Sequence, residues 1–175
     1  MATVDILLGK ARLILKELSG SPMEGFLTPD ASGTDLGPAQ GAILRTSQEF
    51  AEFWEAVNLV TTRMTKKSFG VGAALGERSL TNLAIILQSS VTGGDTVNVD
   101  NSATQTYYTV GLEHERTDGN YFHAVVHKAK QSEASDINIP NEDFDTFDIA
   151  FAGEEDTSQT GHEYGTVTID AAAWT

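Results

Sequence analysis

Residues 121–130 read YFHAVVHKAK, and this stretch decides the fold class because it is rich in β-branched and aromatic side chains and follows the two-residue period of a strand. Three other stretches keep the same period, namely residues 107–113, 146–152 and 166–169. Acidic, turn-prone segments separate them. The chain is therefore predicted to be mainly β, with five or more strands.

One segment has the period of an amphipathic helix instead. Ser79 can cap its N-terminus, and the apolar residues that follow recur at i, i+3, i+4 and i+7: Leu80, Leu83, Ala84 and Leu87. We expect a helix that continues to about Ser90 and packs this apolar stripe across the sheet.

The N-terminal third is harder to assign. Residues 6–18 predict the first strand, and residues 19–41 predict a long irregular connection because Gly, Pro, Ser, Asp and Thr are concentrated there. Within residues 42–76, helical spacing behind Ser47 favours an amphipathic helix over 47–60, on the apolar residues Phe50, Phe53, Trp54 and Val57. The β-rich residues 42–44 and 59–62 leave a strand as the alternative.

Length, charge and cysteine content limit the class of protein. The 175 residues contain no internal repeat and predict a single domain, 1–175. The formal charge is −14, and the last 45 residues hold 11 of the 25 acids and no Lys or Arg. Tight nucleic-acid binding needs clustered bases, so this charge argues against it. Cysteine is absent, which excludes disulfides and thiolate chemistry, and the short apolar run at residues 6–8 predicts neither a signal peptide nor insertion in a membrane.

The residue types that carry chemistry do not form a catalytic set. His114, His123 and His127 are clustered, but two side chains four residues apart on a strand lie about 13 Å from each other, too far to share a metal ion. Residues 70–76 lack the spacing and the βαβ setting of a dinucleotide loop, and residues 94–101 lack EF-hand spacing. We therefore expect no enzyme activity, no metal and no cofactor.

Short stretches along nearly the whole chain form an ordered series. They are LGKARL (8–13), DLG (35–37), ERSLTNLA (77–84), AVVHKAK (124–130), INIPNEDF (137–144), TFDIAF (146–151) and YGTVTI (164–169). In this order they resemble the tail tube, or major tail, proteins of long-tailed bacteriophages.

The resemblance implies a β-sandwich or partial barrel with one packed helix. It also implies six copies that close into a ring, and rings that stack into a hollow tube. Residues 42–76 then become a long hairpin that reaches a neighbouring subunit or ring, with contacts assigned to Phe50, Phe53, Trp54, Val57 and Leu59. Such a protein belongs to the virion tail and is assembled in the host cytoplasm. Its partners are its own copies and the tail terminator, tape measure and tail-tip proteins.

A tube of this kind lets DNA slide through its bore without specific binding. Six copies at −14 each would bring −84 formal charges into one ring, and an acidic bore repels duplex DNA over a screening length of about 8 Å. The acids assigned to the bore are Glu113, Glu115 and Asp148. The strands of one copy are then expected to be incomplete, so that copies finish each other's sheets.

Other functions remain open beside the tube. A monomeric β-sandwich that binds or decorates a partner would use Phe53 and Trp54 as anchors. A tube protein of a bacterial secretion system would have the same sandwich. A metal-dependent hydrolase would have to use the three histidines, against the strand spacing.

Overall fold

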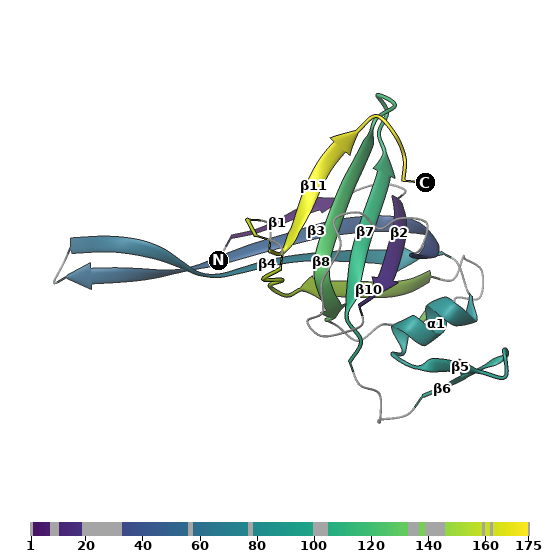
Figure 1. Cartoon of the computed structure of the whole chain (residues 1–175). Helices are drawn as coiled ribbons and strands as arrows, with labels where there is room; N and C mark the ends of the chain where they lie inside the picture. Colours follow the sequence, from purple (N-terminus) through teal and green to yellow (C-terminus); the bar gives the residue numbers. More distant parts are fainter. Residues whose placement is uncertain are drawn as a thin grey trace.

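The computed structural model describes residues 2–7, 11–18, 33–55, 58–76, 79–99, 105–132, 137–138, 146–158, 160–161 and 163–174 (Figure 1). Within these ranges lie eleven strands and one helix. They are β1 (Ala2–Leu7), β2 (Ala11–Glu17), β3 (Thr34–Glu55), β4 (Asn58–Leu75), α1 (Leu80–Ile86), β5 (Ser90–Thr92), β6 (Thr96–Asn98), β7 (Tyr108–Glu115), β8 (Tyr121–Gln131), β9 (Ile137–Asn138), β10 (Thr146–Gly153) and β11 (Gly165–Asp170). The chain is mainly β, which confirms the fold class, and the four alternating stretches are β7, β8, β10 and β11.

Six strands close into a barrel. Antiparallel pairing runs from β8 through β7, β2, β3 and β4 to β10, and β10 pairs with β8 again. The closing ladder is short, with Phe151, Ala152 and Gly153 opposite Gln131, Lys130 and Ala129. The expectation that one copy's strands are incomplete is therefore wrong for the barrel, which closes within a single chain. β1 and β11 extend it at the sides, on β3 and β8.

The core lies inside this barrel because alternate residues of each strand point inward. The large buried apolar side chains of the core cluster come from all six barrel strands and include Leu13, Leu15, Leu36, Leu44, Val71, Leu75, Val110, Leu112, Val126, Phe147, Ile149 and Phe151. Burial of one such side chain contributes about 1.5–3 kcal/mol, so the barrel is the stable part of the chain.

The N-terminal expectations need correction at two places. The single strand predicted over residues 6–18 is two strands, β1 and β2, with residues 8–10 outside the described part. The irregular connection predicted over 19–41 becomes β3 from Thr34 onward, whereas 19–32 lie outside the described residues. Gly37 and Gly41 adopt positive φ of 82° and 58°, and the β3 ladders shift register beside both of them. Turn-type residues here make a bulged strand instead of a loop.

The helix α1 begins where its cap predicts. Ser79 Oγ accepts a hydrogen bond of 3.0 Å from the backbone N–H of Asn82. The buried Asn82 side chain donates to the Leu36 carbonyl at 3.0 Å, and this bond ties the helix to β3. The helix ends at Ile86, earlier than the predicted Ser90, because the backbone turns to positive φ at Gln88. Beyond it, β5 and β6 form a small hairpin through Gly93 and Gly94.

The described residues of the segment 47–60, namely 47–55 and 58–60, are strand, so the locally favoured helix is wrong. β3 and β4 run as one antiparallel ladder out to Glu55 opposite Asn58. This part of the chain extends past the barrel as a ribbon (Figure 1). A helix needs a surface on which to pack its apolar face, and here the backbone groups are paired across the ribbon instead.

Candidate assembly surface

The outer halves of β3 and β4 form a two-stranded arm, here defined as residues 47–55 and 58–68 (Figure 1). Nine residues of strand span roughly 28 Å, so the arm is about as long as a barrel strand such as β7 or β10. Where it leaves the barrel, the Ser47 and Ser68 hydroxyls share a hydrogen bond of 2.6 Å. Two residues further out, Lys66 Nζ lies 4.0 Å from Glu49 Oε1. Cross-strand pairs therefore fix the base of the arm, and the rest projects away from the body.

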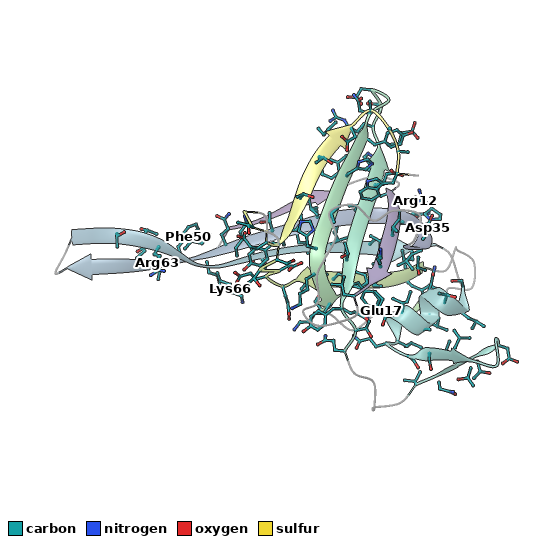
Figure 2. All side chains as sticks on the ribbon, viewed as in Figure 1. Arg12, Glu17, Asp35, Phe50, Arg63 and Lys66 are labelled. Atoms are coloured by element: carbon teal, nitrogen blue, oxygen red, sulfur yellow. The ribbon has the colours of Figure 1, made fainter. Side chains whose placement is uncertain are left out.

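One face of the arm carries an exposed apolar pair. Phe50 and Met64 are register partners on β3 and β4, so their side chains lie on the same face. The exposed fraction is 53% for Phe50 and 48% for Met64. Figure 2 shows Phe50 on the arm, well away from the barrel. Two large apolar side chains at the same point of a projecting ribbon mark a surface suited to contact with another molecule.

Charge is distributed unevenly between the arm and the C-terminal part of the chain. β4 contains three exposed bases, Arg63, Lys66 and Lys67, and no acid. Figure 2 shows Arg63 near Phe50 and Lys66 nearer the base of the arm. Residues 131–175 contain 11 acids and no Lys or Arg. The β3 half of the arm carries three acids, Glu49, Glu52 and Glu55, so the arm as a whole has no net charge, but the bases of β4 are exposed.

The other predicted contact residues lie on or beside the arm. Phe53 and Trp54 belong to the outer end of β3, and Leu59 to the start of β4. Val57 lies outside the described residues.

The predicted helix-packing residues divide between core and surface. Ala84 is buried and Leu83 packs against the barrel core. Leu87 is half-buried at the C-cap, whereas Leu80 is exposed.

The strand β11 is a second exposed region. In the described part of the chain it pairs with β8 along one edge, which leaves its other edge open. Val167 and Ile169 on this strand are 47% and 56% exposed. An open edge with apolar side chains can accept a further strand.

A charged pair lies beside the β8–β10 closure. Lys130 Nζ lies 2.5 Å from Glu154 Oε1. The hydrogen bond from Lys130 lowers the pKa of Glu154, and the same bond raises the pKa of Lys130. Both groups therefore stay charged over a wide pH range. Because Glu154 is already paired with Lys130 of the same chain, it is less available to a base of another copy.

The three acids assigned to a bore do not form one surface. Glu113 on β7 is buried, and its carboxylate contacts Arg12 and His123. It is therefore not available to line a channel. Glu115 at the end of β7 and Asp148 on β10 are exposed. Asp148 borders a shallow hollow of about 290 Å³ together with Arg45 and Gly72.

The three histidines are not brought together either. His123 and His127 are buried on one face of β8, whereas His114 is half-buried on β7 and lies one residue from Glu113 in the chain, so it points to the opposite face. Over the described ranges, no group of three or more His, Cys, Asp or Glu residues is arranged to hold a metal ion. The partners of His123 are the carboxylates of Glu113 and Asp170.

Sequence reasoning missed Met64, the basic side of β4 and the exposed pair on β11. The run TTRMTKK at residues 61–67 carries a signal for the first two, because three bases and no acid follow one another on a β-rich segment. The pairing of Phe50 with Met64 depends on strand register, which the sequence does not give without the turn geometry.

No helix in the described part of the chain has the length and apolar character needed to cross a membrane. Comparison with known proteins gave no matching family model and no similar curated protein.

Proposed function

We propose that this chain is a structural subunit that assembles with its own copies into rings, and that the rings stack into a tube of the bacteriophage-tail type. In this proposal the tube is an acidic conduit through which DNA passes without specific binding. The chain acts through its surfaces and catalyses no reaction. The sequence resemblance set out above suggests this function, and three features of the structure support it.

The arm carries the proposal. A two-stranded ribbon is marginally stable in water by itself, and this one places Phe50 and Met64 in solvent at the same position. Contact with a neighbouring copy would cover this pair and hold the ribbon in place. An arm at one end of the molecule that reaches a different surface of the next copy makes a head-to-tail interface. Interfaces of this kind generate rings when the rotation closes.

The open edge of β11 and the separation of charges support the same function. Pairing of β11 with a strand of a neighbour would cover Val167 and Ile169. Exposed bases of β4 would meet exposed acids in the C-terminal part of another copy. With assembly driven in part by charge, added salt is expected to weaken it.

Assembly of the purified chain tests the proposal. Negative-stain electron microscopy and sedimentation velocity should show rings or tubes as protein concentration rises. The double variant Phe50→Ser with Met64→Ser should remain monomeric. Val99→Ser, which removes a side chain 68% exposed beside β6, is the matched control and should assemble as the unchanged chain does.

Two results would contradict the proposal. One is a chain that stays monomeric at all concentrations and salt conditions. The other is an arm variant that assembles as well as the control, with far-ultraviolet circular dichroism showing that both are folded.

A monomeric binding or decoration module is the second candidate, because the barrel closes within one chain and needs no neighbour to complete its core. For this function the arm would be the binding element. The arm variant would then lose a partner of a different sequence, and no condition would produce rings.

A further inference from the structure

A cluster of charged side chains joins the C-terminal segment to the ends of five strands, β2, β3, β7, β8 and β11. His123 on β8 is 2% exposed. Its Nε2 lies 3.0 Å from Glu113 Oε2 on β7, and its Nδ1 lies 2.9 Å from Asp170 Oδ2 at the end of β11. Asp170 also accepts a hydrogen bond of 3.1 Å from Thr168 Oγ1. One imidazole therefore connects two carboxylates from strands on either side of β8.

The geometry favours one protonation state of the His123 ring. With Glu113 and Asp170 ionised, both partners accept hydrogen bonds and cannot donate them, so each ring nitrogen of His123 has to donate. Only the imidazolium cation donates from both nitrogens. In the neutral ring, one nitrogen would direct its lone pair at a carboxylate, and that contact would change from attractive to repulsive.

The charged groups around His123 make the proton important. Arg12 on β2 places Nη1 3.8 Å from Glu113 Oε1, and its Nε donates to Asp35 Oδ2 of β3 at 2.6 Å. Glu113, Asp170 and Asp35 thus bring three negative charges. Arg12 and a protonated His123 bring two positive charges, whereas a neutral His123 leaves Arg12 as the single positive charge of this cluster.

The C-terminal segment is held at the same place. The indole of Trp174 stacks on the His123 ring with 4.3 Å between the ring centres and 12° between the planes. The Trp174 backbone N–H donates to Glu113 Oε2 at 2.5 Å, and Arg12 Nη1 donates to the Trp174 carbonyl at 3.5 Å. Tyr121, two residues before His123 on β8, lies nearly parallel to the His123 ring with 6.2 Å between the ring centres. Residues 171–173 are exposed, so the hold on this segment comes through Trp174.

We propose that His123, Glu113, Asp170 and Trp174 form a proton-operated clasp for residues 170–174. With His123 protonated the clasp is closed, and Trp174 covers the imidazolium and Glu113. When His123 loses its proton, one contact to a carboxylate becomes repulsive and the cation beneath the indole is lost. The segment is then released, and the buried end of the β7–β8 ladder becomes open to solvent or to another molecule. This device is a property of one copy and does not depend on assembly.

Fluorine nuclear magnetic resonance of the full chain labelled with 5-fluorotryptophan tests the clasp. The chain has two tryptophans, and the variant Trp174→Phe assigns the two signals. A scan from pH 5 to pH 9 covers the range in which histidine side chains ordinarily change charge. As pH rises, the Trp174 signal should move to the position of a solvent-exposed indole and become sensitive to exchange of H₂O for D₂O. Trp54 lies on the arm, so its signal should stay in place, and far-ultraviolet circular dichroism over the same pH range checks that the barrel remains folded.

Variants of His123 and its partners decide the outcome. His123→Gln should remove the pH dependence of the Trp174 signal, and His114→Gln, on the opposite face of the neighbouring strand, should leave it unchanged. Asp170→Asn lies on an exposed strand end, so it tests the clasp even when the His123 variant does not fold. With one carboxylate neutralised, release should occur at lower pH. A Trp174 signal that does not respond to pH, or that responds identically in wild type and in Asp170→Asn, would overturn the clasp.

Discussion

The strands β3 and β4 form two different structures along their length. In the barrel half, Leu44, Val71 and Leu75 are buried to 3% exposure or less. In the arm half, Phe50 and Met64 expose about half of their surface. The β3–β4 ladder runs through both halves and shifts register in each of them, so hydrogen bonding alone does not distinguish the two.

The comparison shows where each half obtains its stability. The barrel half is held by side chains that pack on four other strands, and this burial is complete within one chain. The arm half has its own cross-strand pairs and little else, which is marginal for a two-stranded ribbon. A change in the barrel should therefore affect folding, and a change in the arm should affect contact between molecules.

The largest effect is expected from a cavity in the barrel. Leu112 on β7 is fully buried, and Leu112→Ala should lower the free energy of unfolding by about 2–5 kcal/mol. The arm counterpart Phe50→Ala removes a larger side chain from a mostly exposed position and should change it by about 0.5 kcal/mol or less. Urea denaturation of the monomer measures both. Similar losses in the two variants would show that the arm is part of the folding unit and would break the comparison.

Two glycines of β4 show how closely its backbone packs against β10 at two positions in the barrel half. A Cβ added at Gly70 would lie 2.5 Å from the Phe151 carbonyl oxygen of β10, a backbone atom that cannot move alone. At Gly72 the nearest atom would be the Ile149 carbonyl oxygen at 3.7 Å, an ordinary contact. Gly70→Ala should therefore cost about 1–3 kcal/mol, as overpacking does. Gly72→Ala should be neutral or stabilise by about 0.4–1 kcal/mol.

Thermal unfolding of these two variants sharpens the boundary. Gly70 faces Arg45 in the β3–β4 ladder, close to the Ser47–Ser68 pair from which the arm projects. Equal melting temperatures for the two variants would mean that β4 and β10 separate easily at this point. The rigid part of the chain would then end deeper in the barrel.

The mainly β fold and the strands β7, β8, β10 and β11 could be predicted because β-branched and aromatic residues are concentrated there. Only in β10 does burial alternate with the sequence, whereas β7 and β8 are buried on both faces and β11 is mostly exposed. The arm could not, since the spacing of Phe50, Phe53, Trp54 and Val57 favours a helix and fits a strand only when apolar residues lie on both of its faces. Tertiary pairing with residues 58–68 decides between the two. The start of β3 is predicted as a loop because glycines such as Gly37 and Gly41 are typical of turns. In the structure these two glycines lie at bulges of the strand.

The candidate surface could be predicted in part. Phe50 was found from its apolar character, whereas Met64 depends on the register of the hairpin. Acids were abundant, but which of them face solvent depends on partners far away in the sequence. Glu113 is buried because Arg12 and His123 lie beside it on neighbouring strands. No local pattern around Glu113 contains that information.

A pH-dependent contribution to stability is expected in the body of the molecule. The hydrogen bond from His123, followed by that from Thr168, holds the pKa of Asp170 below its usual value of 3.8. A carboxylate whose pKa is lower in the folded than in the unfolded chain stabilises the fold above the unfolded value. This stabilisation is lost as pH falls through the folded value. Between about pH 5 and pH 2, the melting temperature of the wild type should therefore fall more steeply than that of Asp170→Asn.

Parallel slopes for the two proteins would show that Asp170 is not held in this way. Thr168→Val removes the hydrogen bond that lowers the pKa of Asp170 less than the bond from His123 does. The melting temperature of this variant should therefore fall with pH at a rate between those of the other two proteins. The hydrogen bonds that cause this pH dependence lie at the ends of β8 and β11, and none is on the arm. Substitutions on the arm should therefore leave the pH dependence of the melting temperature unchanged.

The smallest effect separates two cross-strand ion pairs, one in each region. Lys130 and Glu154 lie 2.5 Å apart beside the barrel closure, with about a third of each side chain exposed. Lys66 and Glu49 on the arm are 4.0 Å apart and more exposed. Solvent screens both pairs, so Glu154→Gln should cost about 0.2–1 kcal/mol and Glu49→Gln close to zero in the monomer. In 1 M salt, where the screening length is about 3 Å, the difference between the two variants should shrink. The opposite result is that Glu49→Gln lowers the free energy of unfolding more than Glu154→Gln does. The tighter electrostatic contact would then lie on the arm, and the arm would not be the weakly held half of β3 and β4.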